Sequence, residues 1–440
     1  MNNFMWFIGK SHLDFKQYQF DGVKWAIENE LSEEVLSSHN KIKGGFIADE
    51  MGLGKTITML GIIFANYHKK TLIVLPNALL LQWASEIFRL TGYKPIIYHG
   101  PNKQKVGLTD LENAHIVLTS YSTLAVSKKR QTCLLHQINW YRCVFDEAHH
   151  LRNANSRYLG ARKLQTNIHW LISGTPVQNK QKDFYVLCSV LGLPVSYYKY
   201  KEYRAELFSK YVLHRTKLQV GIIIPNLEIT NTFVDWKSNE ERIISTYIHE
   251  KLKDSGEKFK NIQKAQKMCI LPSLLQIPIM NTITTSKMDC VIDTIVSRKG
   301  NGAGKLVFCH FYAEIDMIIT KLKEGGMTNI ANYDGRIKIG KGKNNRLLEK
   351  YEVLVIQIQT GCEGLNMQTN YSEVYFVSPN WNPAVESQAI ARCHRIGQCK
   401  PVYVFKFIMN NLDNIDNNSM DNYMIKVQDK KQLVIKDILS

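Results

Sequence analysis

The 440-residue sequence has no pair of cysteines spaced Cys-x-x-Cys, although it contains nine cysteines. Structural zinc modules are usually built on such pairs, so a module of this kind is not expected. Two cysteines directly precede a histidine, in Cys309-His310 and Cys393-His394, but neither has a second pair to complete a metal site. We therefore expect packed or incidental thiols.

Long apolar runs are also missing. No segment reaches the roughly 18 consecutive apolar residues that a membrane helix needs, so we expect no membrane span and no membrane partner. The apolar residues 1–8 form a short stretch without a basic flank, which does not read as a secretory signal. Together with the odd number of cysteines, this predicts a reducing compartment.

Acidic residues are scarce relative to basic ones. The sequence contains 56 lysines and arginines against 39 aspartates and glutamates, a formal net charge of +17. Clustered basic side chains attract phosphates, so this excess favours a polyanionic partner such as nucleic acid. A chain of 440 residues, 45% of them hydrophobic, is long enough for two or three domains with their own cores.

Short apolar runs of strand length alternate with segments of helix length. This order is typical of a parallel sheet flanked by helices, and it occurs twice, so we predict two α/β units. The expected strands are 44–48, 71–75, 115–119, 142–145 and 169–172 in the first unit, and 305–309, 328–333, 353–358, 374–378 and 401–407 in the second. The expected helices include 56–68, 78–90, 183–191, 313–324 and 383–396.

The segment from 200 to 285 does not show this alternation of strand-length and helix-length segments. Aromatic, basic and helix-forming residues mix there with three prolines, so we predict a helical connector with short protrusions. The tract 410–422 reads as a polar linker, and apolar residues among lysines in 424–439 predict an amphipathic helix. The expected divisions are a first lobe at 1–200, a connector at 201–285, a second lobe at 286–409, and a linker with a C-terminal brace helix at 410–440.

The stretch ADEMGLGKT at 48–56 follows an apolar run and precedes an expected helix. Gly52 and Gly54 allow the backbone N–H groups of such a loop to face a phosphate at the helix N-terminus. Lys55 is then placed for the terminal phosphates of a nucleotide, and the hydroxyl of Thr56 for magnesium. A standard loop has glycine where this sequence has Asp49, so the motif alone leaves a chance Gly-Lys-Thr open.

A second motif, YRCVFDEAHH at 141–150, favours the nucleotide interpretation. Asp146 and Glu147 end an apolar strand, and a carboxylate pair at this end of a strand suits magnesium binding and the orientation of water beside a phosphate loop. The alternative is an acidic pair that caps a helix. His149 and His150 lack cysteine partners, so we expect one to couple the nucleotide site to the following segment and the other to lie on the surface.

With these motifs in order, the chain resembles the Swi/Snf family of superfamily-two, helicase-like DNA translocases. The first half matches the family at FKQYQFDGVKW (15–25), ADEMGLGKT (48–56), LIVLPNALLLQWASEI (72–87), VLTSYSTL (117–124), DEAHHLRN (146–153) and SGTPVQN (173–179). The second half matches it at KLVFCHFYAEIDMIITKL (305–322), YDG (333–335), TGCEGLNM (360–367) and WNPAVESQAIARCHRIGQCKPV (381–402). The wording NPAVESQAI is similar to the branch that contains helicase-like transcription factor.

The resemblance implies two tandem RecA-like P-loop lobes that use ATP and Mg²⁺. It assigns the adenine edge to Gln19, and it makes aspartate usual at position 49. The implied ATP contacts are Gln19, Asp49, Glu50, Met51, Gly52, Leu53, Gly54, Lys55, Thr56, Gly364, Arg392 and Arg395, with Thr56 and Asp146 for magnesium. The implied catalytic residues are Lys55, Asp146, Glu147, Arg392 and Arg395.

The two arginines of the second lobe, Arg392 and Arg395, are three residues apart on an expected helix, so they would point from one face. In the family they act as arginine fingers on the γ-phosphate. The implied DNA contacts are Thr119, Ser120, Ser173, Gly174, Thr175, Thr360, Gly361, Trp381 and Asn382. Turn formation or helix capping is the alternative role of the Ser and Thr residues. His214, in YVLHRTKLQV at 211–220, replaces a usual basic residue, which argues against a DNA or regulatory contact there.

The activity implied is that of an ATP hydrolase that moves along double-stranded DNA, in chromatin remodelling, transcription or repair. Its targets would be a nucleosome or another DNA-bound complex such as a polymerase. We expect it in the nucleus, or, if it is viral, in the virion or at a cytoplasmic replication site. Two alternatives stay open: a strand-separating helicase, and a DNA-binding clamp that does not hydrolyse ATP.

Overall fold

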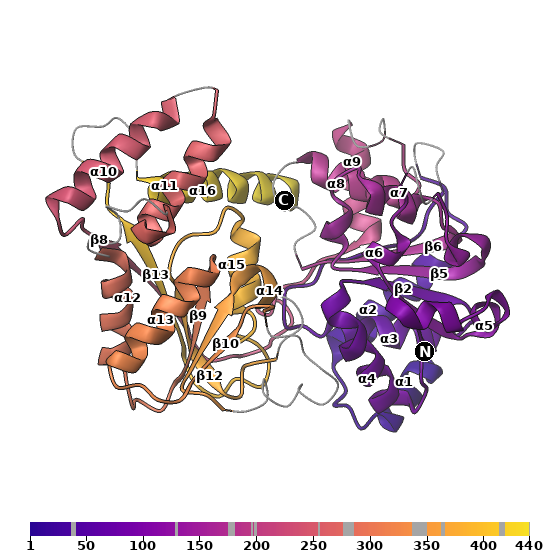
Figure 1. Ribbon diagram of the computed structural model, residues 1–440. Coiled ribbons are helices and arrows are strands. Elements are labelled where there is room, and N and C mark those ends of the chain that lie inside the picture. Colours follow the sequence, from indigo (N-terminus) through magenta and orange to yellow (C-terminus); the bar gives the residue numbers. More distant parts are fainter. Residues whose placement is uncertain are drawn as a thin grey trace. The chain divides into compact units, whose positions relative to one another are not determined.

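The computed structural model describes residues 1–36, 41–127, 131–174, 181–194, 197, 200–253, 256–275, 286–336, 350–361, 366–412 and 419–439. The chain divides into two compact units, Met1–Ile223 with Val434–Ser440, and Ile224–Leu433 (Figure 1). Each unit contains its own parallel sheet, so the predicted α/β class with two tandem lobes is confirmed.

The first unit contains a seven-stranded sheet in the order β3-β4-β2-β5-β6-β1-β7, and its described strand pairs are parallel. The strands are β1 (Lys43–Ile47), β2 (Thr71–Leu75), β3 (Ile96–Tyr98), β4 (Ile116–Ser120), β5 (Asn139–Asp146), β6 (Gln165–Ile172) and β7 (Val212–Leu213). The strands predicted for this unit are confirmed. The strands β3 and β7 were not predicted, because three and two residues are too short to show a periodic pattern.

Helices cover both faces of this sheet. One face is covered by α1 (Asn2–Lys10), α2 (Gln17–Leu31), α3 (Lys55–Ala65) and α4 (Leu80–Thr91), and the other by α5 (Leu108–Asn113), α6 (Tyr121–Leu124), α7 (Ser156–Arg162), α8 (Gln181–Val190) and α9 (Lys201–Tyr211). Short 3₁₀ helices occur at Asn77–Leu79, Gly100–Lys105, Leu134–Gln137 and Ala148–Leu151. Neighbouring strand residues such as Leu72 and Ile73 enter opposite cores, as the alternation of a strand requires.

The second unit contains a six-stranded sheet in the order β10-β11-β9-β12-β13-β8, also with parallel pairs. The strands are β8 (Leu227–Val234), β9 (Gly304–Cys309), β10 (Ile330–Tyr333), β11 (Val353–Gln357), β12 (Tyr371–Phe376) and β13 (Val402–Met409). The segment 201–285 was expected to be helical, and β8 corrects that expectation. It is an edge strand with mostly exposed residues, so its sequence carries no alternating core signal.

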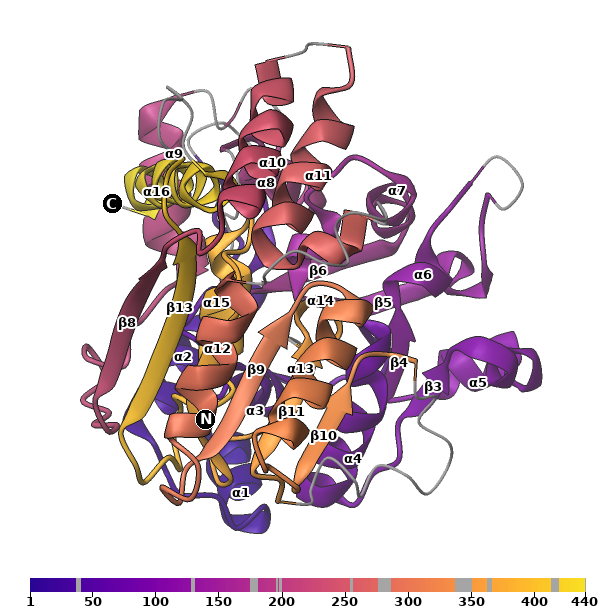
Figure 2. The same cartoon turned by 60° about the vertical axis from the view of Figure 1, so that its left-hand side comes forward.

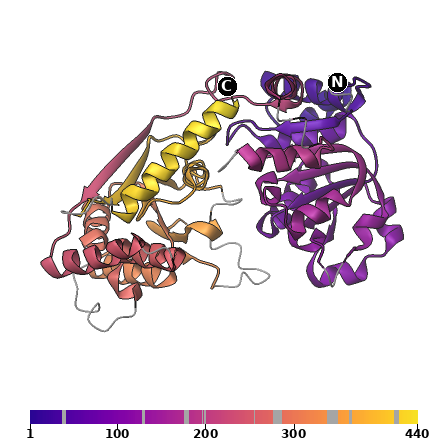
Figure 3. The ribbon, with the colours of Figure 1, turned by 90° about the horizontal axis from the view of Figure 1, so that it is seen from above.

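The helices of the second unit also lie on two faces. One face is covered by α10 (Asn239–Glu250), α11 (Lys258–Ile270), α12 (Ser286–Ser297), α13 (Tyr312–Glu324) and α16 (Met420–Leu439), and the other by α14 (Ile358–Gly361) and α15 (Pro383–Ile390). Two 3₁₀ helices lie at Lys251–Lys253 and Pro272–Leu275. Figure 2 shows α12 and α13 beside β9, and Figure 3 shows the long helix α16, which was predicted over 424–439. No helix in the described part of the chain is long and apolar enough to cross a membrane.

A buried ion pair ties α2 to the middle of the first sheet. Arg142 on β5 and Glu30 on α2 both have fully buried side chains, and the guanidinium group donates to both carboxylate oxygens. Glu30 also accepts hydrogen bonds from Trp170 Nε1 at 2.8 Å and from Asn66 Nδ2 at 2.7 Å. Because buried charges are costly unless their hydrogen bonds are satisfied, this network fixes the helix that carries Gln19.

We predict that Glu30→Gln lowers the free energy of unfolding by about 3–5 kcal/mol, because Arg142 keeps a buried charge without its counter-charge. Urea unfolding followed by tryptophan fluorescence measures this loss. The matched control is Glu33→Gln, which removes ion pairs with Lys41 and Lys43 at the surface and should change unfolding little. Equal effects of the two substitutions would contradict the structural role of Glu30.

Candidate active site

Residues 48–54 form the turn from β1 to α3 at the carboxyl edge of the first sheet. Gly52 and Gly54 have φ angles of 96° and 77°, a region that favours glycine. Gly54 is the N-cap of α3 and provides no side-chain cap to the first turn of this helix. Lys55 begins this helix, and its Nζ donates to the backbone oxygen of Asp49 at 2.8 Å. The arrangement suits an anion.

Gln19 lies directly over this turn. Its side chain is buried, and its Nε2 donates to the backbone oxygen of Leu53 at 3.4 Å. The hydroxyl of the neighbouring Tyr18 donates to the same oxygen at 3.0 Å. A Cβ atom on Gly54 would lie 2.8 Å from Gln19 Nε2, so the missing side chain of Gly54 lets α2 approach this closely.

Asp146 ends β5 and is held by three hydrogen bonds. Its carboxylate accepts from Trp83 Nε1 at 2.8 Å and from the backbone N–H of Glu147 at 2.9 Å, and its backbone oxygen accepts from the Tyr121 hydroxyl at 2.6 Å. Burial and the charge of Glu147 raise the pKa of Asp146, while the indole N–H and the charge of Lys55 act in the opposite direction. The structure therefore places Lys55 and Asp146 within electrostatic reach of each other.

Glu147 has a left-handed backbone with φ 49°, at the N-cap of the 3₁₀ helix Ala148–Leu151. Such conformations are costly for a non-glycine residue and are common at functional sites. Its Oε2 lies 3.3 Å from Nδ1 of His149, and the rings of His149 and His150 stack with centroids 4.7 Å apart. The coupling role expected of one histidine stays a prediction. Among the described residues no group of three or more His, Cys, Asp or Glu side chains could hold a metal ion.

The end of β6 also reaches the turn. The backbone N–H of Ser173 continues the pairing of β6 with β1. A Cβ atom on Gly174 would lie 2.8 Å from Met51 Cγ and 3.2 Å from Lys55 Nζ. Gly174, which was predicted to contact DNA, therefore lies against the turn at 48–54 and Lys55. The predicted contact Thr175 falls outside the described residues.

Two other predicted DNA contacts, Thr119 and Ser120, have buried side chains. The hydroxyl of Thr119 donates to the backbone oxygen of Tyr98 at 2.8 Å. The hydroxyl of Ser120 accepts from the backbone N–H of Thr123 at 3.2 Å and thus caps α6. Both hydroxyl groups therefore form hydrogen bonds within the fold. For Ser120 this bond is a helix cap, the alternative to a DNA contact. Ser122, in the same turn, is exposed.

Helix α15 is shorter than predicted and ends before both of the predicted finger residues. The backbone oxygens of Arg392 and Cys393 accept from the N–H of Met367 at 3.1 Å and from Nε2 of Gln398 at 3.2 Å. These bonds take the place of helical ones, and the chain turns. Arg392 and Arg395 therefore lie in turns, and the prediction that they share one helix face is wrong.

The two arginines are nevertheless close to each other. Burial and the charge of Arg392 lower the pKa of Arg395, whose Nη1 donates to Oδ1 of Asn366. Neighbouring guanidinium groups repel each other, so an anion beside them would be favourable. Gly364, the other ATP contact predicted in this unit, falls outside the described residues.

The remaining predicted contacts lie in two turns of the second unit. The backbone of Thr360 and Gly361 ends α14, and the side chain of Thr360 falls outside the described part. The ring of Trp381 meets that of Tyr423 edge to face, with centroids 6.2 Å apart. Asn382 caps α15, because its Oδ1 accepts a backbone N–H of the first turn at 3.1 Å.

Two protein families match this chain. The SNF2-related domain matches residues 18–206, and the helicase conserved C-terminal domain matches residues 286–397. These ranges contain the glycine turn at 48–54, the Asp146-Glu147 pair and both arginines. The chain belongs to the SNF2-related, helicase-like ATPases. The family resemblance seen in the sequence is thereby confirmed.

Individual relatives of this SNF2-related chain come from bacteria, viruses and plants. An uncharacterized ATP-dependent helicase of Mycoplasma pneumoniae is 28% identical over 98% of the chain and 42% of the relative, so the chain spans about two fifths of that protein. A probable global transactivator of Orgyia pseudotsugata multicapsid polyhedrosis virus is 25% identical over 96% of the chain and 91% of the relative. The ATP-dependent DNA helicase DDM1 of Arabidopsis thaliana is 26% identical over 89% of the chain and 58% of the relative.

A solved structure, the Sulfolobus solfataricus SWI2/SNF2 ATPase core in complex with dsDNA, also aligns with the chain. The two are 22% identical, the alignment covers 97% of this chain and 93% of the other, and the TM-score is 0.43.

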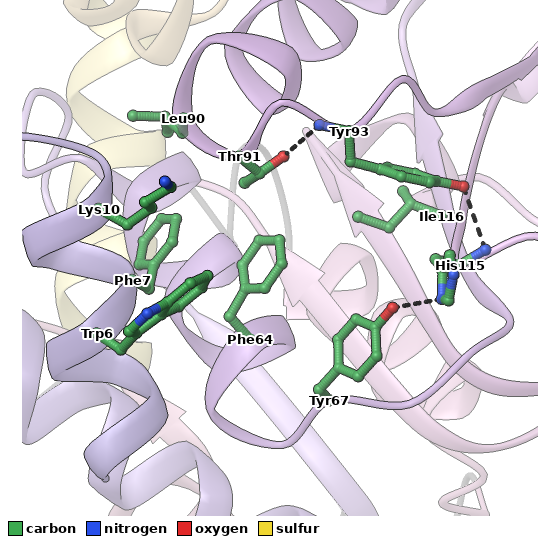
Figure 4. Close-up of a pocket in the computed structure, with 10 residues that line it drawn as sticks. All are labelled: Trp6, Phe7, Lys10, Phe64, Tyr67, Leu90, Thr91, Tyr93, His115 and Ile116. Carbon is green, nitrogen blue, oxygen red and sulfur yellow. Dashed lines mark hydrogen bonds between the residues drawn. The ribbon is translucent and has the colours of Figure 1, made fainter.

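A separate cavity of about 150 Å³ lies at the opposite, amino edge of the first sheet (Figure 4). Aromatic rings form much of its wall, among them Trp6 of α1 and Phe64 and Tyr67 near the end of α3. The Tyr93 hydroxyl accepts from the backbone N–H of His115 at 3.3 Å, and the Tyr67 hydroxyl forms a hydrogen bond with the ring of His115. Because α3 runs away from the phosphate loop toward this edge, the cavity is not part of the active site.

We predict that Lys55→Ala weakens ATP binding about tenfold or more, because a charge-assisted hydrogen bond to phosphate is lost. Titration with a fluorescent ATP analogue measures the change. The matched control is Lys69→Ala, which removes an exposed lysine beyond the other end of α3 and should leave the affinity unchanged. Wild-type affinity in Lys55→Ala would refute the role assigned to this lysine.

Proposed function

We propose that the protein is a DNA-stimulated ATP hydrolase that moves along double-stranded DNA. The observation that carries this proposal is that the glycine turn at 48–54 with Lys55, and Asp146, lie at the carboxyl ends of parallel strands of the first sheet, in a chain of the SNF2-related family. The clustered arginines Arg392 and Arg395 in the second unit support it.

The residues at this edge fit a triphosphate with magnesium. The N-terminus of α3 offers backbone N–H groups, Lys55 offers a cation and Thr56 a hydroxyl group. Asp146 offers a carboxylate that Trp83 already orients, and bound magnesium would neutralise phosphate charge. Gln19, which lies over the glycine turn, would contact the adenine edge.

Glu147 would orient the attacking water, because it follows the magnesium-binding aspartate directly. Arg392 and Arg395 would stabilise the charge that develops on the transferred phosphate. An arginine finger is worth about 10³–10⁵ in rate, which corresponds to roughly 4–7 kcal/mol of barrier. Since these arginines belong to the second unit and Lys55 to the first, turnover would require both units, and this requirement would couple hydrolysis to movement.

Several features support DNA as the track. The net charge of +17 favours a polyanion. Contacts through hydroxyl groups and backbone N–H groups, such as Ser122 and the turn at 381–382, would bind phosphate and carry no sequence information. A DNA helicase and a viral transactivator are among the relatives. The targets we propose are DNA-bound proteins such as nucleosomes or polymerases, in the nucleus or at a viral replication site.

The ATPase rate with duplex DNA, single-stranded DNA and RNA tests this function. We expect the strongest stimulation by duplex DNA. Stronger stimulation by RNA would overturn the proposal. Unwinding of a forked duplex in a parallel assay would assign a strand-separating helicase instead, and DNA binding without any hydrolysis would assign a clamp.

We predict that Glu147→Gln lowers kcat by about 10²–10⁴, because the variant cannot act as a base toward water. Binding of a fluorescent ATP analogue and of duplex DNA should stay close to wild type. The control is Glu112→Gln, an exposed residue of α5. Normal turnover in Glu147→Gln would remove this residue from the chemistry.

We predict that Trp83→Phe raises the Mg²⁺ concentration needed for half-maximal ATPase activity about 10- to 100-fold, as for other groups that orient a metal ligand. The substitution removes the indole N–H that donates to Asp146 and keeps a large ring. The matched control is Trp25→Phe, because Trp25 Nε1 donates to the backbone oxygen of Lys210 in the same unit. An unchanged Mg²⁺ requirement would show that Trp83 only fills space.

A further inference from the structure

The chain that follows α9 runs alongside the phosphate loop. Strand β7 pairs with β1, and the pairing continues beyond both strands. The backbone N–H of Ala48 donates to the oxygen of Leu213 at 2.8 Å, and that of Glu50 donates to the oxygen of Arg215 at 2.9 Å. The segment 213–215 is therefore attached to the first half of the loop. Neither composition nor the motif at 211–220 predicted this contact.

Arg215 extends from this segment to both walls of the nucleotide site. Its Nε donates to Asp49 Oδ1 at 3.0 Å and its Nη2 donates to Asp49 Oδ2, a bidentate ion pair with a fully buried carboxylate. Its Nη1 donates to the backbone oxygen of Tyr18, next to Gln19. A Cβ atom on Gly22 would lie 2.9 Å from Nη2, so this glycine makes room for the guanidinium group.

We propose that Arg215 is a positioning residue of the nucleotide site and that it sets the preference for adenine. By joining Asp49 of the loop to Tyr18 of α2, its planar group fixes the position of Gln19 relative to the phosphates. Gln19 can discriminate between bases only when its donor and acceptor groups are held at a fixed position relative to the bound phosphates. This inference rests on the proposed function, in which Gln19 contacts the base.

The same segment provides a matched comparison in Lys217. Its Nζ donates to Glu50 Oε1 at 2.8 Å, and its backbone N–H donates to Glu50 Oε2 at 2.7 Å. Both bonds hold Glu50 of the loop. Loss of Arg215 therefore disturbs the position of the base relative to the phosphates, whereas loss of Lys217 acts on the loop through Glu50.

The experiment measures dissociation constants for fluorescent analogues of ATP and GTP with the full chain. Arg215→Lys keeps the positive charge but cannot bind Asp49 through two nitrogens and Tyr18 at once. We expect its ATP-to-GTP affinity ratio to fall about tenfold from the wild-type value, the equivalent of one hydrogen bond to a charged partner. Lys217→Gln should leave the ratio unchanged.

Asp49→Asn tests the same contact from the other side and replaces Arg215→Lys if that variant does not fold. It should lower the ratio similarly, and the double variant should lose little more, because the two residues act as one unit. The inference would be overturned by an unchanged ATP-to-GTP affinity ratio in a folded Arg215 or Asp49 variant, including the case in which the affinities for both nucleotides fall equally. A wild-type protein that prefers ATP but gains no ATPase activity from DNA would instead overturn the proposed function and leave this inference standing.

Discussion

The buried carboxylate of Asp146 is the constraint on which the active site depends. A carboxylate removed from water must be surrounded by donors. Its two donors are Trp83, on the helix after β2, and the backbone N–H of Glu147, which follows β5. The hydroxyl of Tyr121, which begins the helix after β4, donates to the backbone oxygen of Asp146. Because the sheet order sets β4, β2 and β5 side by side, the turns expected to meet DNA and the proposed magnesium ligand are joined by direct hydrogen bonds.

The sequence predicted the parts of the fold whose residues are buried. The strands with apolar runs and the helices with one apolar face were found, because burial imposes a period on the sequence. The edge strand β8 faces solvent along most of its length, and β7 has two residues, so neither carries such a period. The predicted end of α15 was wrong for a different reason. Hydrogen bonds from Met367 and Gln398 to backbone oxygens of residues 392 and 393 accompany a turn of the chain there.

The residues of the candidate site also differ in whether the sequence predicted them. Lys55, Asp146 and Glu147 were predicted because local motifs define them, and the charge of Lys55 acts to lower the pKa of Asp146. Arg215 was missed, since its partner Asp49 is 166 residues away in the sequence. A signal was present: an aspartate in a loop that normally has glycine is a charge that needs a counter-charge. The arginine in the connector motif was the candidate to supply it.

The bidentate pair of Asp49 and Arg215 has a consequence for sequence divergence. Glycine at position 49 would restore the standard loop but would leave a guanidinium group of low exposure without its counter-ion. An aliphatic residue at position 215 would likewise leave the buried carboxylate of Asp49 without its counter-ion. Neither change is neutral by itself, so across descendants of this gene the two positions should mutate in concert, as an epistatic couple.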